Sequence, residues 1–256
     1  MDAIFLPEKR RAEAAAVGYV VPDWETIIRL HLSKVIKKNI TKFLDQYMVN
    51  TLINKVRDKN PDIIDDVFFL HNFSTSNIKT ILNWLLEEGV CIRDMNTILE
   101  AIADNLEESK RLSELMEKVR EKLAWQFLTK IADDKKILHI IKVSPPLAQT
   151  LLEHIFIPQA KNELPYFDLP PEDSKKLNAE ITKKSDCMKS KGFVPVFLTE
   201  SNLRTAFSRY IKHYFGNWHC ISDTELYSVS KDYSVIVEEE LEVDEIKVNE
   251  AYTDSN

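Results

Sequence analysis

Six histidines are the residues of this chain best suited to bind a metal or to move a proton, and their spacing supports neither role. No HExxH or HxH pattern occurs, although zinc enzymes depend on ligands that share one face of a helix or strand. Glu153 and His154 are adjacent on an expected helix, and no second ligand follows four residues later. We therefore expect no metal site and no cofactor, and we expect His31 and His139 to be packed, hydrogen-bonded structural residues.

The sequence also contains no pattern that is typical of nucleophilic catalysis. GxSxG does not occur, and His219 and Cys220 are neighbours on an expected strand, where adjacent side chains point to opposite faces. Carboxylate pairs such as Glu87–Glu88 lie where helices are expected to begin or end, so we interpret them as solvated helix termini. The four isolated glycines cannot form the glycine-rich loops that bind dinucleotides or nucleoside triphosphates. The sequence predicts no catalytic residue.

Composition and charge narrow the class of protein further. The chain has 34 Lys and Arg against 41 Asp and Glu, a formal net charge of −7, which argues against a nucleic-acid partner. Its three cysteines are far apart and form no CxxC, which favours reduced thiols in a cytosolic compartment. No apolar run approaches the ~20 residues that a membrane span requires. These features indicate a soluble protein of one or two domains.

Apolar periodicity predicts that the first half of the chain is almost entirely helical. Apolar residues recur every three to four positions, and Asp23, Thr75 or Ser76, and Asp94 are suited to cap helices. The expected helices span about residues 23–38, 41–59, 61–69, 75–89, a stretch beginning at 94, and 109–132.

The pattern changes after residue 132 to a mixture of strands and helices. Residues 136–143, 193–198 and 218–222 are typical of strands, and an edge strand is expected from Val235. Between them, helices are expected from Leu147, over 171–189, and from Ser201, which is suited to cap the last of them. The predicted fold class is mostly α with an α+β C-terminal part, in which a small sheet packs with helices.

An isolated strand is expected at Gly18–Val21, ahead of the helical region. A strand needs a neighbour to satisfy its backbone hydrogen bonds, and the following ~110 residues are expected to be helical. We therefore expect its partner strands to lie outside this chain, which would make the chain a fragment of a longer protein.

Residues 90–104, VCIRDMNTILEAIAD, join a capped helix start to a strong apolar stripe. They closely resemble the segment V-x-I-R-D-L-x-T-I-L-E-A-L-A-D of the FlhA-type (FHIPEP) export-gate proteins of bacterial flagella and type III secretion systems. Further segments resemble the same family in the same order: GYVVPDWETIIRLHL (18–32), LMEKVREKL (115–123), IIKVSP (140–145), the strand and LR of 197–204 with Arg209, and CISDTEL (220–226).

The resemblance implies more than the composition does. Members of the family have a multi-span membrane domain and a cytoplasmic domain of four subdomains, which assembles into a nonameric ring below the export channel. It implies that residues 1–22 end the first subdomain as a strand remnant, that 23–132 form the helical, ring-forming third subdomain, and that 133–245 form the α+β fourth. Residues 246–256 are expected to be a disordered tail. The membrane domain and the second subdomain, which bears most of the chaperone groove in flagellar members, have no counterpart.

The resemblance also implies partners. In the family the helical subdomains pack side by side, so exposed polar residues of residues 23–132 are candidate ring contacts. Other expected partners are export-apparatus proteins, the export ATPase complex and export substrates, at the cytoplasmic face of the inner membrane, with the membrane reached only through the missing N-terminal domain. The candidate ring residues are Arg29, Lys38, Arg57, Arg93, Asp94 and Glu100. Arg93 and Asp94 are equally consistent with roles inside the chain, as a loop contact and a helix cap.

Two further questions stay open at the level of sequence. Ile92–Asp94, Ala103–Asp104 and Asn60–Ile64 are more similar to flagellar members than to injectisome members, which favours the flagellar assignment slightly. A stand-alone helical adaptor would use the same amphipathic faces, but would not associate into rings. A metal-dependent hydrolase is the enzyme alternative, and it would retain bound metal after purification.

Overall fold

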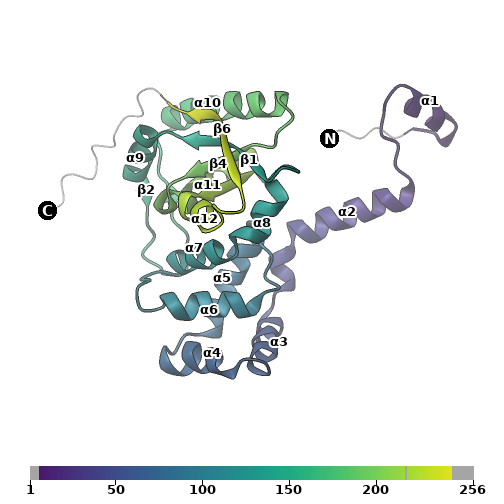
Figure 1. Cartoon of the computed structure of the whole chain (residues 1–256). Coiled ribbons are helices and arrows are strands. Elements are labelled where there is room, and N and C mark those ends of the chain that lie inside the picture. Colours follow the sequence, from purple (N-terminus) through teal and green to yellow (C-terminus); the bar gives the residue numbers. More distant parts are fainter. Residues whose placement is uncertain (1–5, 217, 244–256) are drawn as a thin grey trace. The chain divides into compact units, whose positions relative to one another are not determined.

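The computed structural model describes residues 6–216 and 218–243 of the chain, so the C-terminal tail expected at 246–256 lies outside the described residues. The chain divides into two compact units, residues 1–43 and 44–256. Figure 1 shows the elements of both units, which are described separately below.

The regular elements in the described part of the first unit are all helices, and no strand occurs there. It consists of η1 (Glu8–Arg10), α1 (Arg11–Ala16), α2 (Trp24–Lys38) and η2 (Ile40–Phe43). Gly18–Val21, expected as a strand whose partners lie outside this chain, is not a strand in the described residues, and its expected partner strands stay a prediction. Gly18 instead adopts φ 90° and ends α1, and the amide of Tyr19 donates to the carbonyl of Ala14 at 3.1 Å, a pairing typical of a Schellman cap. Among the described residues no strand pairs with this segment.

The second unit opens with a helical layer. It contains α3 (Gln46–Arg57), α4 (Pro61–Asp65), the π-helix η3 (Asp66–Leu70), α5 (Thr75–Glu87), α6 (Met95–Asn105), α7 (Leu112–Lys122) and α8 (Ala124–Ile131). Two expected helices are interrupted. The helix expected over 41–59 begins only at Gln46, because Asp45 caps it by accepting from the amide of Met48 at 2.7 Å. The helix expected over 109–132 divides at Leu123, whose ψ of 4° leaves the helical range.

A four-stranded parallel sheet forms the middle of the second unit. Its order is β5–β4–β1–β6, from His219–Ser222, Val196–Thr199, Ile137–Val143 and Ser234–Leu241, so β6 is an edge strand as predicted. Helices α9 (Pro145–Glu153), α10 (Pro171–Ser190), α11 (Ser201–Phe215) and α12 (Asp223–Ser228) connect or follow the strands. Helix α12 and the antiparallel pair β2 (Ile155–Phe156) and β3 (Tyr166–Phe167) were not predicted. Ser201 is not the N-cap of α11, since Glu200 takes that position.

The sheet is covered on both faces. Leu138 and Ile140 of β1 belong to one core with the helical layer, whereas Ile141 and Val143 belong to a second core with α9, α10 and α11. Burial on both faces explains why the two central strands, β1 and β4, are largely apolar. The predicted fold class, mostly helical with an α+β C-terminal part, is confirmed. No helix in the described part is both long and apolar enough to cross a bilayer.

Candidate functional site

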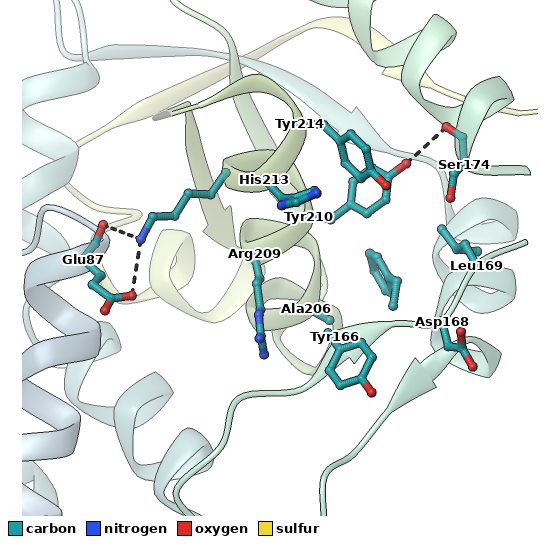
Figure 2. A pocket seen from close by; sticks show the side chains of 12 residues that line it. Glu87, Tyr166, Asp168, Leu169, Ser174, Ala206, Arg209, Tyr210, His213 and Tyr214 are labelled. Carbon is teal, nitrogen blue, oxygen red and sulfur yellow. Dashed lines mark hydrogen bonds and ion pairs between the residues drawn. The ribbon is translucent and has the colours of Figure 1, made fainter. Parts of the chain in front are cut away.

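A hollow of about 610 Å³ lies beside α11, next to the β2–β3 pair (Figure 2). Its walls include Tyr166 of β3 and Arg209, Tyr210 and Tyr214 of α11. The guanidinium of Arg209 lies 5.4 Å from the centre of the Tyr166 ring, and its Nη1 donates to the carbonyl of Leu164 at 2.7 Å. The hollow is therefore aromatic, with a cation held against its wall.

Most polar groups of this hollow are already engaged within the chain. Lys212 Nζ donates to the carbonyl of Glu87 at 3.3 Å and lies 3.4 Å from its Oε2. The Tyr210 hydroxyl donates to the carbonyl of Ser174 at 3.2 Å. Burial raises the pKa of Tyr210 to about 12, so this hydroxyl stays protonated at neutral pH. These features suit a contact surface better than a catalytic centre.

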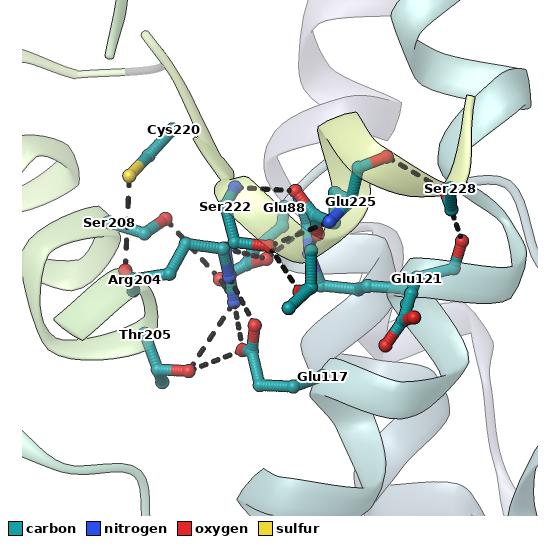
Figure 3. A network of polar contacts seen from close by, with 12 residues as sticks. Glu88, Glu117, Glu121, Arg204, Thr205, Ser208, Cys220, Ser222, Glu225 and Ser228 are labelled. Atoms are coloured by element: carbon teal, nitrogen blue, oxygen red, sulfur yellow. Dashed lines mark hydrogen bonds and ion pairs between the residues drawn. The ribbon is translucent and has the colours of Figure 1, made fainter. Parts of the chain in front are cut away.

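A buried ion-pair network joins the helical layer to the other half of the second unit (Figure 3). The interlayer network consists of Glu88 at the end of α5, Glu117 and Arg120 of α7, Arg204 of α11 and Glu225 of α12. The two arginines are almost completely buried, with side chains 4% and 0% exposed. Buried arginines are rare unless they are paired, so the network explains their position.

The geometry of the network is a chain of charge-assisted hydrogen bonds. Arg120 donates through Nε to Glu225 at 2.6 Å and through Nη1 to Glu88 at 2.7 Å. Arg204 donates to the same Glu88 oxygen through Nη1 at 3.0 Å and to Glu117 through Nε at 2.6 Å. Glu88 therefore bridges the two arginines, and elements far apart in sequence are fixed to one another.

The charges within the network keep its groups ionised. Burial alone would raise the pKa of Glu88, but the positive charges of Arg204 and Arg120 hold it below its ordinary value. Burial would likewise lower the pKa of Arg204, but Glu117 and Glu88 raise it well above the ordinary value. Glu88 also occupies the C-cap of α5, where the helix dipole disfavours a carboxylate. The two arginines offset that cost.

Local structure holds the outer members of the network in place. Glu225 completes a capping box at the start of α12: its carboxylate accepts from the amide of Ser222 at 3.0 Å, and Ser222 Oγ accepts from the amide of Glu225 at 3.1 Å. The Arg120 guanidinium lies 4.7 Å from the centre of the Phe127 ring. Glu225 is thus oriented by the start of its own helix, and Arg120 by a ring of the neighbouring helix α8.

The network brings together residues that no sequence pattern connects. Glu117 and Arg120 belong to the LMEKVREKL segment, Arg204 to the LR segment and Glu225 to CISDTEL, three of the stretches that carry the family resemblance. The interpretation of Glu88 as a solvated helix terminus is wrong, because its side chain is 13% exposed; Glu87 beside it is exposed. The usable signal was that these charged residues lie in segments that carry the family resemblance.

None of the six candidate ring residues is a member of this network. Arg29 and Lys38 are exposed on α2, in the first unit, and Arg57, Arg93 and Glu100 are exposed in the helical layer of the second. Asp94 is half-buried and caps α6, accepting from the amide of Thr97 at 3.2 Å and from its hydroxyl at 2.8 Å. Among the described side chains, no hydrogen bond or ion pair joins any two of the six.

The two histidines predicted to be packed, His31 and His139, lie in different environments. His139 is packed as expected: its Nδ1 lies 2.8 Å from Glu238 and its ring stacks on Phe193 with centroids 3.7 Å apart. His31 is exposed on α2, so the expectation that it would be packed is wrong. Within the described ranges, no group of three or more histidine, cysteine or acidic side chains is placed to hold a metal ion.

The fold is that of the C-terminal domains of type III export gates. The nonameric EPEC SctV-C structure has a TM-score of 0.75 at 21% identity, covering 91% of this chain and 68% of that one. The Chlamydia pneumoniae CdsV structure has a TM-score of 0.76 at 21% identity, covering 94% and 69%. CdsV has also been solved in complex with CdsO, with a TM-score of 0.75, 21% identity and coverage of 92% and 67%.

Sequence relatives agree with the fold. The flagellar biosynthesis protein FlhA of Treponema pallidum is 28% identical over 208 residues, which cover 80% of this chain and 29% of the relative. FlhA of Helicobacter pylori is 29% identical over 210 residues, covering 81% and 28%. The chain thus spans less than a third of the length of these relatives. The FHIPEP family model matches residues 1–231, and the chain belongs to the FHIPEP family. The family of export-gate proteins is not known for enzymes.

Proposed function

We propose that this chain acts as a cytoplasmic part of a bacterial type III protein export gate and that copies of it assemble into a ring that receives export substrates. The observation that carries the proposal is the family match over residues 1–231 together with the shared fold of a nonameric relative. In this proposal the chain is not an enzyme and has no cofactor. It works at the cytoplasmic face of the inner membrane and presents surfaces to other proteins.

The proposal assigns roles to the parts of the chain. Residues 1–22 end a first subdomain, 23–132 build the ring, and 133–245 form the fourth subdomain. The interlayer network supports this division of roles, because it fixes the helical layer of the second unit to helices α11 and α12. In this proposal, a rigid connection lets the helical subdomain assemble into the ring while the fourth subdomain presents its surface to partners. The six candidate ring residues are part of the proposal, and Asp94 already has an internal role as a helix cap.

Partners follow from the same proposal. Besides copies of itself, the chain is proposed to meet other export-apparatus proteins, the ATPase complex and export substrates, and to reach the membrane through a further domain. The complex of CdsV with CdsO supports a protein partner of this kind, since this chain shares the fold of CdsV. We favour the flagellar system, because Ile92–Asp94 resembles flagellar members and the FlhA proteins are sequence relatives.

A secretion experiment in the source bacterium tests the proposal. The gene is deleted, and the culture medium is assayed for flagellar subunits and for injectisome effectors by mass spectrometry. Loss of flagellar subunits, restored by the gene on a plasmid, is expected. Loss of effectors alone would replace the flagellar assignment with the injectisome, and unchanged export of both would contradict the export-gate function.

A further inference from the structure

The edge strand β6 departs from regular pairing in its second half. Its register against β1 shifts by one residue after Val237, so that Glu238 is an extra residue on β6, a β-bulge. A bulge at the edge of a sheet redirects side chains. Here Glu238 and Glu239 both approach the ammonium group of Lys191, at 3.0 and 3.4 Å, although neighbours on a regular strand would point to opposite faces.

His139 of β1 lies between two carboxylates that belong to different parts of the chain. Its Nδ1 is 2.8 Å from Oε1 of Glu238 on β6, and its Nε2 is 3.7 Å from Oδ2 of Asp133, just before β1. Stacking on the ring of Phe193 holds the imidazole in this orientation. The side chain of His139 is 13% exposed, so the ring is largely removed from solvent.

The end of α10 supplies the positive charges of this cluster. Lys191 contacts Glu238 and Glu239, and Lys184 Nζ lies 3.2 Å from Oε2 of Glu239. The thiol of Cys187 donates to Oε1 of Glu239 at 2.9 Å. The titratable groups around His139 are therefore three carboxylates, two ammonium groups and one thiol, all in the second unit. Together with His139 we call them the β6 seat: Asp133, His139, Lys184, Cys187, Lys191, Glu238 and Glu239.

The β6 seat lacks one positive charge when His139 is neutral. Its three carboxylates and two ammonium groups then leave a net charge of −1, and a protonated imidazole makes the seat neutral. Hydrogen bonding favours the same state. A neutral imidazole has a single N–H and donates to one carboxylate, whereas an imidazolium directs one N–H toward Glu238 and the other toward Asp133.

The carboxylates of the seat keep their charge over the pH range in which histidine titrates. Hydrogen bonding with His139 lowers the pKa of Glu238 below its ordinary value of 4.5, and hydrogen bonding with the Cys187 thiol does the same for the pKa of Glu239. Backbone amides lower the pKa of Asp133. Histidine is the residue type that changes charge between about pH 5 and 8, so titration of the seat in this range falls to its histidine.

We infer that β6 is a pH-responsive edge strand. Protonation of His139 binds Glu238 and Asp133 to one ring and holds β6 firmly on β1, and loss of the proton loosens β6. The edge of β1 that β6 covers is a row of backbone N–H and C=O groups, to which another strand can pair when it is uncovered. The protonation state of one histidine therefore controls access to this edge of the sheet.

Hydrogen exchange of the full 256-residue chain, read by peptide mass spectrometry, tests the inference. The measured quantity is the protection of the peptide that contains Ser234–Leu241, which is the intrinsic exchange rate at each pH divided by the observed rate. Protection is expected to rise at least about threefold from about pH 7.5 to about pH 5.5, because the imidazolium adds charge-assisted hydrogen bonds. A peptide from the central strand β4, Val196–Thr199, should change less than this.

Three variants assign the effect to the β6 seat. His139→Gln keeps a hydrogen-bonding side chain that cannot be protonated, and its β6 protection should no longer rise on acidification. His213→Gln is the matched control, since His213 is exposed on α11, and it should behave like the unchanged chain. Glu238→Gln removes one negative charge, so the seat is already balanced with neutral His139 and acidification should give no rise. It serves as the test if circular dichroism shows that His139→Gln does not fold.

Three results would overturn the inference. The first is β6 protection that stays constant or falls on acidification of the unchanged chain. The second is a rise that persists in His139→Gln or Glu238→Gln, because another group then causes it. The third is an equal rise in the β4 peptide, which would show that the whole unit, and not the seat of β6, responds to pH. None of these results bears on the proposed export function, which the secretion experiment tests separately.

Discussion

Replacement of Arg204 by methionine is the most direct perturbation of the interlayer network. The side chain of Arg204 is 0% exposed and donates to both Glu88 and Glu117. Methionine is similar in length and apolar, so packing is largely kept while the charge and its hydrogen bonds are lost. Glu88 then keeps Arg120 as a partner, whereas Glu117 loses the arginine that donates to it.

The expected loss of stability is large because the pair is buried. Removal of one partner from a buried ion pair typically costs about 3–5 kcal/mol, since the remaining charge is uncompensated. That is a substantial part of the ~5–15 kcal/mol that stabilises a typical protein. For a chain of this size the melting temperature should fall by about 6–20 °C. Arg204→Met combined with Glu117→Gln should recover part of the loss, because one unpaired charge is also removed.

The pH dependence provides a second signature of the same network. The pKa of Glu88 lies below its ordinary value of 4.5 in the folded protein, so its pairing stabilises the fold above about that pH and less as the pH falls through the folded value. The difference in unfolding free energy between the unchanged chain and Arg204→Met should therefore shrink as the solution is acidified below about pH 4.5.

Urea unfolding followed by circular dichroism measures both effects. Arg93→Met is the matched control, since Arg93 is exposed, and it should change the unfolding free energy by no more than about 0.5 kcal/mol. A loss below about 1 kcal/mol for Arg204→Met, or a difference that grows on acidification, would refute the assigned role of the network.

Three other outcomes are expected. Asp94→Ala should destabilise the protein by about 0.5–2 kcal/mol in urea unfolding because α6 loses its cap, whereas Asp94→Asn should be nearly neutral; equal losses would contradict the capping role. Burial raises the pKa of Cys220 to about 12, so iodoacetamide at pH 8 should label exposed Cys91 and leave Cys220 unmodified in the native protein, as read by peptide mass spectrometry. Phe207→Ala should cost about 3–5 kcal/mol in thermal or urea unfolding, since its ring is fully buried in the core with α9 and α10; a loss below 1 kcal/mol would show that this core is loosely packed.

Local patterns in the sequence were sufficient to predict most of the helices and strands. The strand over Ile137–Val143 and the helices at Asp23 and Asp94 depend on apolar spacing and on caps within a few residues, so the sequence shows them directly. The break at Leu123 and the end of α1 at Gly18 each depend on the backbone angles of a single residue. Because the apolar periodicity continues unchanged across Leu123, the sequence pattern does not show that break. The β2–β3 pair has only two residues in each strand, too few for a periodic signal.

The candidate site was less predictable, for a physical reason. Members of the interlayer network that contact each other are separated by as many as 116 residues, as with Glu88 and Arg204, and each is an ordinary surface residue by type. Only the packing of α5, α7, α11 and α12 makes them buried partners.

Cryo-electron microscopy of the purified chain over a range of concentrations tests the central claim most directly. Because the chain shares the fold of a nonameric relative and belongs to the FHIPEP family, closed rings are expected, with the helical layers side by side. Monomers alone, at every concentration up to the limit of solubility, would contradict the claim that this chain builds the ring of an export gate.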